Sequence, residues 1–219
     1  MIVYASRTGT RRNLAAMRRR GWRLLISRAG VWRTEGFPWA ADNGAWSDFL
    51  AQRPFDEEAF ERFLAWIEAQ PTAPDWLVLP DIVAAGLPSL ALSLRYLNRC
   101  LAVVPMVLIA VQDGMEAADL APFVGPSVGI FLGGSTEWKV ERMRYWGDFC
   151  ALDPETGQPR AQAIHYHVAR ANTRRRIWMA AGAGAWSIDG SSGTRYAQTI
   201  PLIDAASRQM DMLSPRRAA

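Results

Sequence analysis

Apolar runs of four to six residues alternate with longer amphipathic segments along almost the whole chain. The runs lack the strict apolar–polar alternation of a sheet with one solvated face, so they are typical of parallel strands buried on both faces. These runs predict strands at residues 2–5, 24–27, 39–42, 76–81, 106–111, 128–132, 163–168 and 185–188.

Helical signals lie between the runs. An acidic first turn at residues 56–58 follows Pro54, and Phe60, Phe63, Leu64 and Ile67 then recur at helical spacing. Further helices are predicted at residues 87–101, from Thr136 onward and around 173–181. A basic helical segment separates the first two runs, a short helix precedes the sixth, and a last amphipathic stretch ends near residue 213.

Eight strand–helix units predict an α/β fold, a compact (β/α)8 barrel of the TIM type. We expect one domain over residues 1–213 and a frayed tail over 214–219. An open, doubly wound sheet is the alternative architecture. That fold more often has a glycine-rich phosphate loop after its first strand, and residues 7–10 do not form one.

Composition narrows the class of protein. The chain has 219 residues, of which 50% are hydrophobic, and no run of about 18 apolar residues that would span a membrane. The start, an apolar run followed by arginines, reverses the order of a secretory signal, so we expect a cytoplasmic protein. Cys100 and Cys150 are the only cysteines, and we expect both in the core rather than in a disulfide or a zinc site.

The positive charge is carried almost wholly by arginine, since Lys139 is the only lysine and the net charge is +4. Three clusters stand out: Arg7, Arg11 and Arg12; Arg18, Arg19, Arg20 and Arg23; and Arg170, Arg174, Arg175 and Arg176. Guanidinium groups match phosphate oxygens and stack on bases, which suits a nucleic-acid footprint. The alternative interpretation is that the arginine clusters form a solvated basic face with no nucleic-acid partner.

Polar residues follow the predicted strands from the third to the eighth. They are Asp42 and Asn43, Asp81, Gln112 and Asp113, Gly133 and Gly134, His167 and Arg170, and Asp189. Any one of them could be a turn or cap residue, but in a barrel all six sets converge on one mouth. Two acids far apart in sequence, Asp42 and Asp189, are what an exchange reaction at a glycosidic carbon uses.

A metal site is an alternative, because His165 and His167 lie two apart on a strand and face the same side. No second histidine motif or glutamate cluster accompanies them, so we expect no metal and no cofactor. The case for a Ser-His-Asp hydrolase is weaker than the case for a metal site, because no serine lies in a Gly-x-Ser-x-Gly turn.

The series of motifs resembles the guanine transglycosylases, barrel enzymes that exchange guanine for a 7-deazaguanine base. The segment 42–46 resembles their Asp-Ser-Gly-Gly-Phe motif, and Leu79-Pro80-Asp81 resembles a later acidic segment. The turns at 112–114 and 133–135 resemble their Gln-Gly-Gly and Gly-Gly-Leu turns. Ile188-Asp189 with Thr194-Arg195 resembles the segment that carries the nucleophile. The likeness covers residues 40–195 and is closest to the DpdA-like branch of phage and bacterial DNA-modification systems.

The resemblance implies a role for each site residue. Asp189 would be the nucleophile and Asp42 the acid/base, while Asp81 would accept hydrogen bonds from a guanine edge. Gln112 and the Gly134 amide would bind the six-position oxygen, with Asn43, Gly133, His167 and Trp46 lining the pocket. Arg170, Arg174 and Arg195 would hold phosphates that flank an extruded base.

One departure from the family concerns its zinc. The tRNA-directed enzymes carry a structural zinc after the last barrel strand, and no cysteine set here could bind one, so we expect no zinc subdomain. DNA is therefore expected as the partner rather than tRNA, together with a free 7-deazaguanine base and accessory DNA-modification proteins. A tRNA enzyme, a DNA or nucleoside N-glycosidase and a non-catalytic nucleic-acid-binding barrel remain the alternatives.

Overall fold

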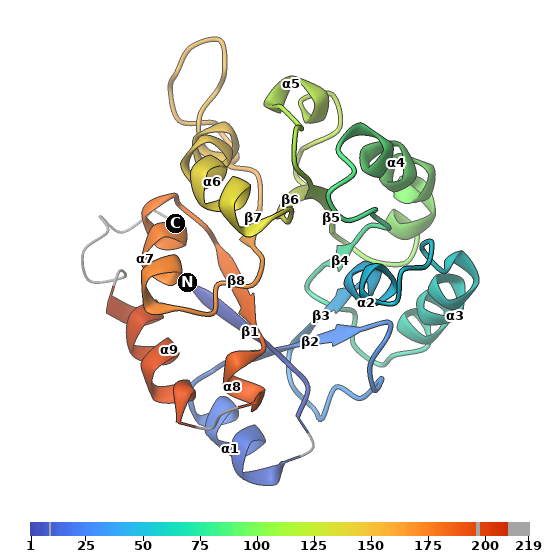
Figure 1. Ribbon diagram of the computed structural model, residues 1–219, viewed down its shortest axis with the longest axis vertical. Coiled ribbons are helices and arrows are strands. Elements are labelled where there is room, and N and C mark those ends of the chain that lie inside the picture. The colour runs from blue at the N-terminus through green and yellow to red at the C-terminus, as the bar shows by residue number, and fades with distance from the viewer. Residues whose placement is uncertain (9, 196–197, 210–219) are drawn as a thin grey trace.

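The computed structural model describes residues 1–8, 10–195 and 198–209. Its centre is a closed barrel of parallel strands, each hydrogen-bonded to the next in sequence, with the last closing on the first (Figure 1). The strands are β1 (Ile2–Ser6), β2 (Arg23–Ser27), β3 (Trp39–Asp42), β4 (Leu77–Val78), β5 (Val107–Val111), β6 (Val128–Leu132), β7 (Tyr166–Val168) and β8 (Ser187–Gly190). The predicted (β/α)8 barrel is confirmed, and the open sheet is excluded.

Helices surround this barrel (Figure 1). They are α1 (Arg11–Arg19), α2 (Ala45–Leu50), α3 (Glu57–Glu68), α4 (Leu87–Leu101), α5 (Ala117–Leu120), α6 (Thr136–Ala151), α7 (Arg174–Gly182), α8 (Ser192–Arg195) and α9 (Thr199–Gln209). Side-chain caps fix several starts: Asp56, Ser135 and Thr173 each accept a hydrogen bond from the amide three residues later. The connection between β2 and β3, residues 28–38, contains no helix.

Successive strand residues face opposite sides of the barrel wall, which divides the core in two. Ala41 and Ile109 pack outward against the helices, in the larger apolar cluster. Ala40, Val78 and Ala110 belong to a separate cluster that fills the barrel interior. The last inward positions of the strands open on the mouth formed by their carboxyl ends.

The strand bounds differ from the prediction by more than one residue in three strands. β4 is confined to Leu77–Val78, because Pro80 has no N–H to extend the ladder. β7 begins three residues later than expected, at Tyr166. β8 is displaced by two residues, so Asp189 lies within the strand, beside Tyr4 of β1, instead of in the turn after it.

Both cysteines are buried and unpaired, Cys100 in α4 and Cys150 in α6, as expected. Among the described residues, no helix combines the length and apolar character needed to cross a bilayer. The expected tail, residues 214–219, and the expected end of the domain at 213 lie outside the described residues.

Candidate functional site

A cavity of about 310 Å³ opens at the carboxyl ends of the strands, and we call it the mouth cavity. Its size is at the lower end of the range for small-molecule sites, about 300–1,000 Å³. It brings together most of the residues expected at the site: Asp42, Asn43, Trp46, Asp81, Gln112, Gly133, Gly134, Arg170 and Asp189. Ser27 and Asn172 also line it and were missed by the sequence analysis, since neither follows an acidic or glycine-rich motif.

Asp42 ends β3 and lines the mouth cavity. Burial and, to a smaller extent, the negative charge of Asp189 raise the pKa of Asp42 to about 6, against hydrogen bonds from Ser27 and the Gly44 amide that lower it. A carboxyl with this pKa exchanges a proton near neutral pH, which is what a general acid and base requires.

Asp81 is held by two side-chain amides on the adjoining strand ends. Asn43 Nδ2 donates to Asp81 Oδ1 at 2.6 Å, and Gln112 Nε2 donates to Oδ2 at 2.5 Å. Burial raises the pKa of Asp81 to about 7, more strongly than these bonds lower it. A carboxylate offers about four lone pairs, so each oxygen keeps acceptor capacity toward the cavity.

Gly134 is required to be glycine by its own backbone and its neighbours. Its φ is +72°, and a Cβ there would lie 2.5 Å from Asp113 Oδ2 and 2.9 Å from Trp138. A side chain would therefore collide with Asp113 and with Trp138 of the following helix, α6. The Gly134 amide donates to Gln112 Oε1 at 3.0 Å, so in this structure it is not free to bind a ligand oxygen.

Asp189 is 9% exposed and, like Asp42, lines the mouth cavity. Its Oδ1 accepts the Arg170 amide at 3.0 Å and contacts His167 Nε2 at 3.1 Å. Oδ2 has no hydrogen-bond partner within the described part of the chain. The carboxylate is thus anchored through one oxygen, and the other remains unbound.

His167 is fully buried and does not line the mouth cavity, contrary to the expectation that it lines the pocket; it contacts Asp189 instead. Its ring stacks on Phe131, with centroids 4.9 Å apart, and contacts Trp76 at 4.7 Å. His165 contacts Ser187 Oγ at 3.3 Å. Over the described residues, no three His, Cys, Asp or Glu side chains are grouped to hold a metal ion.

Trp46 lies on α2 at the edge of the mouth and is 43% exposed. Its ring stacks on Phe49 at 5.4 Å, and the Arg170 guanidinium lies 4.3 Å above it. Arg170 lies in the loop after β7 and also donates to the Gly134 carbonyl, in the loop after the neighbouring strand β6, at 2.9 Å. The Trp46 ring, although exposed, is thus packed by a second ring and by a guanidinium group.

The arginine clusters divide between the two ends of the barrel. Arg11, Arg12, Arg174 and Arg175 are exposed in the first turns of α1 and α7, which follow the carboxyl ends of β1 and β7 at the mouth. The described residues provide none of these four with an ion pair. Arg195 ends α8, and its side chain lies outside the described part of the structure.

The cluster Arg18–Arg23 lies at the opposite end, where the strands begin. Arg23 pairs with Asp75 at 2.7 Å, and Arg20 lies 3.6 Å from Asp204. These two cations stabilise the fold at the end of the barrel remote from the mouth. The expectation that this cluster belongs to a nucleic-acid footprint therefore loses its geometric basis.

Lys139 is a buried residue near the site that the sequence analysis did not select. It is 1% exposed on α6, and its Nζ donates to the Ala169 carbonyl at 2.6 Å. Burial lowers the pKa of Lys139 to about 8, and the charge of Arg170 lowers it too, while Asp189 opposes the shift. Lys139 thus secures the loop that carries the Arg170 amide to Asp189.

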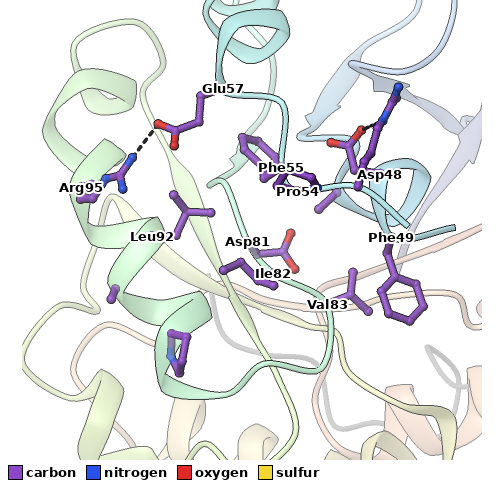
Figure 2. Close-up of a pocket in the computed structure, with 14 residues that line it drawn as sticks. Asp48, Phe49, Pro54, Phe55, Glu57, Asp81, Ile82, Val83, Leu92 and Arg95 are labelled. Carbon is purple, nitrogen blue, oxygen red and sulfur yellow. Dashed lines mark hydrogen bonds and ion pairs between the residues drawn. The ribbon is translucent and has the colours of Figure 1, made fainter. Parts of the chain in front are cut away.

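A second cavity, of about 520 Å³, lies beside the mouth between α2, α3 and α4, and we call it the side cavity (Figure 2). Its walls are mainly apolar, with Phe49, Phe55 and Leu92 among them. The charged groups at its edge pair with one another: Glu57 with Arg95 at 2.5 Å and Asp48 with Arg53 at 2.9 Å. Asp81 lines both cavities and forms part of the wall between them.

No protein-family model matches this sequence, and no curated protein shows significant similarity to it.

Proposed function

We propose that the protein is a DNA-guanine transglycosylase, which exchanges guanine in DNA for a free 7-deazaguanine base through a covalent aspartyl–sugar intermediate. The observation that carries the proposal is the pair of carboxyls in the mouth cavity. Asp189 is anchored with one oxygen unbound, whereas Asp42 has a pKa near 6. One carboxylate for attack and one carboxyl for proton transfer are the pair that glycosidic substitution uses.

In the first half-reaction Asp189 Oδ2 attacks C1′ of the target nucleotide. The C1′–N9 bond breaks, and the departing base takes the electron pair and a proton from Asp42. In the second half-reaction the incoming 7-deazaguanine attacks C1′ and displaces Asp189, and its N9 proton passes to Asp42. The enzyme returns to its starting protonation state, and no net hydrolysis occurs.

Base selection is assigned to Asp81 and Gln112. The free lone pairs of Asp81 accept from the N1 and exocyclic amine groups of a guanine edge, which adenine does not present. One N–H of Gln112 Nε2 is engaged by Asp81, and the second is assigned to the six-position oxygen. The Gly134 amide is left with its bond to Gln112 Oε1 and is no longer assigned to the base.

Nucleic-acid binding is assigned to the mouth edge. The exposed arginines of α1 and α7 stand beside the cavity, where they can contact phosphates that flank an extruded nucleotide. Stacking of the base is assigned to Trp46, with the base taking the place of the Arg170 guanidinium that lies over the ring in this structure. The choice of DNA over tRNA rests on the sequence resemblance, so the test includes both substrates.

The test is base exchange with purified protein. Duplex DNA, single-stranded DNA and tRNA are each incubated with 7-cyano-7-deazaguanine, digested to nucleosides and analysed by mass spectrometry, beside an Asp189→Ala control. We expect a modified deoxynucleoside that disappears in the control. Modification of tRNA alone would assign the protein to the tRNA branch, and abasic product without insertion would favour an N-glycosidase. No change in any substrate would overturn the proposed exchange.

A further inference from the structure

Three side chains inside the barrel form a hydrogen-bonded row that ends on Asp189. His165 Nε2 lies 3.3 Å from Ser187 Oγ, and Ser187 Oγ lies 2.8 Å from His167 Nδ1. His167 Nε2 lies 3.1 Å from Asp189 Oδ1. The row is possible because β7 and β8 are in register at His167 and Ser187, which directs alternate residues of both strands inward.

The chemistry of each group fixes where the protons lie. A carboxylate only accepts hydrogen bonds, so His167 Nε2 must carry the hydrogen that faces Asp189. A neutral imidazole has a single N–H, so Nδ1 of His167 accepts from the Ser187 hydroxyl. The Ser187 oxygen then accepts from His165 Nε2–H. Every hydrogen in the row therefore points toward Asp189.

The surroundings keep both imidazoles neutral. Burial lowers the pKa of His165 to about 4, and burial also lowers the pKa of His167, against the opposing effect of Asp189. Besides Asp189, the charged group that acts on His167 is Lys139, and the neighbouring rings are Tyr4, Trp76 and Phe131. The opposite tautomer would set a nitrogen lone pair against the carboxylate at 3.1 Å, which is repulsive.

We propose that His165, Ser187 and His167 are positioning residues that hold Asp189 Oδ1 through an ordered row of neutral hydrogen bonds and leave Oδ2 aimed at the reacting carbon. The inference rests on the proposed function for the identity of the atom that Oδ2 attacks. The order of the protons in the row does not depend on the proposed function. A neutral donor fixes the carboxylate without the charge of a cation, which would weaken its attack.

The proton order can be measured directly, because His165 and His167 are the only histidines in the chain. Imidazole ¹⁵N–¹H spectra of tag-free protein at pH 7 should show both residues neutral, with the hydrogen on Nε2. Ser187→Ala removes the hydroxyl that donates to His167 Nδ1. We expect His167 to keep its hydrogen on Nε2, which faces Asp189, while the ¹⁵N resonance of its Nδ1 moves downfield because that nitrogen loses its hydrogen bond. An Nδ1–H or doubly protonated His167 in the wild type, or an unchanged Nδ1 resonance in Ser187→Ala, overturns the proposal.

A matched pair of variants tests positioning in catalysis. In His167→Gln the side-chain nitrogen stands near the position of Nε2 and can still donate to Asp189, whereas in His167→Asn it stands near Nδ1 and cannot. We expect His167→Asn and Ser187→Ala to lower kcat of exchange about 10- to 100-fold with KM little changed, and His167→Gln to recover most of the loss. Equal losses in both His167 variants, when both are folded by circular dichroism, overturn the positioning role. A wild type with the expected tautomers but no exchange overturns the proposed function alone.

Discussion

The mouth cavity and the side cavity share Asp81 as part of their walls, yet the pKa values of other acids that line them are shifted in opposite directions. In the side cavity, hydrogen bonds from Tyr96 and Arg95 hold the pKa of Glu57 below its usual range. In the mouth cavity, burial raises the pKa of Asp42 to about 6 and that of Asp81 to about 7. The larger cavity, about 520 against about 310 Å³, is therefore the one in which Asp48 and Glu57 are already paired with arginines, and Asp81 is the acid that it shares with the mouth cavity.

The difference shows what marks a reactive site in this molecule. An acid paired with an arginine at an exposed edge is neutralised and contributes little more than surface packing. A buried acid whose hydrogen-bond donors are all neutral has a raised pKa and can exchange its proton near neutral pH. Burial of its charged form lowers the stability of the folded protein. We therefore expect substitutions in the mouth cavity to change chemistry and substitutions in the side cavity to leave it nearly unchanged.

The largest effect is expected at Asp189. Asp189→Asn keeps the size of the side chain but removes the nucleophile, and kcat of exchange should fall by about 10³-fold or more. Burst-phase measurement of the covalent sugar adduct, trapped by denaturing gel, checks the step directly. Retention of the adduct in the variant would assign the nucleophile to another residue.

The second-largest effect is expected for Asp42→Asn. Because the variant cannot transfer a proton, kcat of exchange should fall by about 10²- to 10⁴-fold. A substrate whose leaving base needs no proton, such as a nucleotide with a highly acidic base, should recover much of the rate. If that activated substrate is slowed as much as guanine, Asp42 has a role other than proton transfer.

Asp81→Asn should change selectivity more than turnover. The amide replaces an acceptor with a donor on the guanine edge, so KM for the free base should rise about 10- to 100-fold. For a base that lacks the exocyclic amine, the rise in KM should be smaller than the rise for guanine. Steady-state exchange with the two bases gives the ratio, and an unchanged ratio would contradict the assignment of Asp81 to the amine.

The raised pKa of Asp42 also predicts how stability depends on pH. A free aspartate has a pKa near 3.9, so between about pH 4 and 6 the folded state binds more protons than the unfolded state. The free energy of unfolding therefore falls as pH rises through this window. Asp42→Asn should be more stable than the wild type above pH 6, by on the order of 1–3 kcal/mol, and about equal near pH 4. Urea unfolding at pH 4 and 7.5 measures the difference, and the same difference at both pH values would refute it.

The smallest effect is expected in the side cavity. Glu57→Gln breaks the pair with Arg95 at an exposed edge, and exchange rates should change by about twofold at most. The variant also serves as the matched control for the three aspartate substitutions. A loss comparable to that of Asp81→Asn would show that the side cavity takes part in the reaction.

Hydrophobic patterning was sufficient to predict the barrel, because each strand coincides with or overlaps a predicted apolar run, and the helices capped by Asp56, Ser135 and Thr173 begin where expected. It also placed Asp42, Asp81 and Asp189 near one mouth, since parallel strands share their carboxyl ends.

Features that depend on packing between distant segments were not predictable in this way. The row through Ser187 requires the β7–β8 register, which no local pattern specifies. The side cavity arises from how α2, α3 and α4 pack, and α2 itself is too short for a clear helical period. The bond between Gly134 and Gln112 likewise joins residues on different strand ends.

Lys139 gives the molecule an unusual chemical property. As the only lysine, it carries the sole ε-amine of the chain, and that amine is buried against the Ala169 carbonyl. An amine-reactive reagent should therefore modify Lys139 only when α6 separates from the loop after β7. The rate of that modification reports local opening at the wall of the mouth, and a ligand that seals the mouth should slow it.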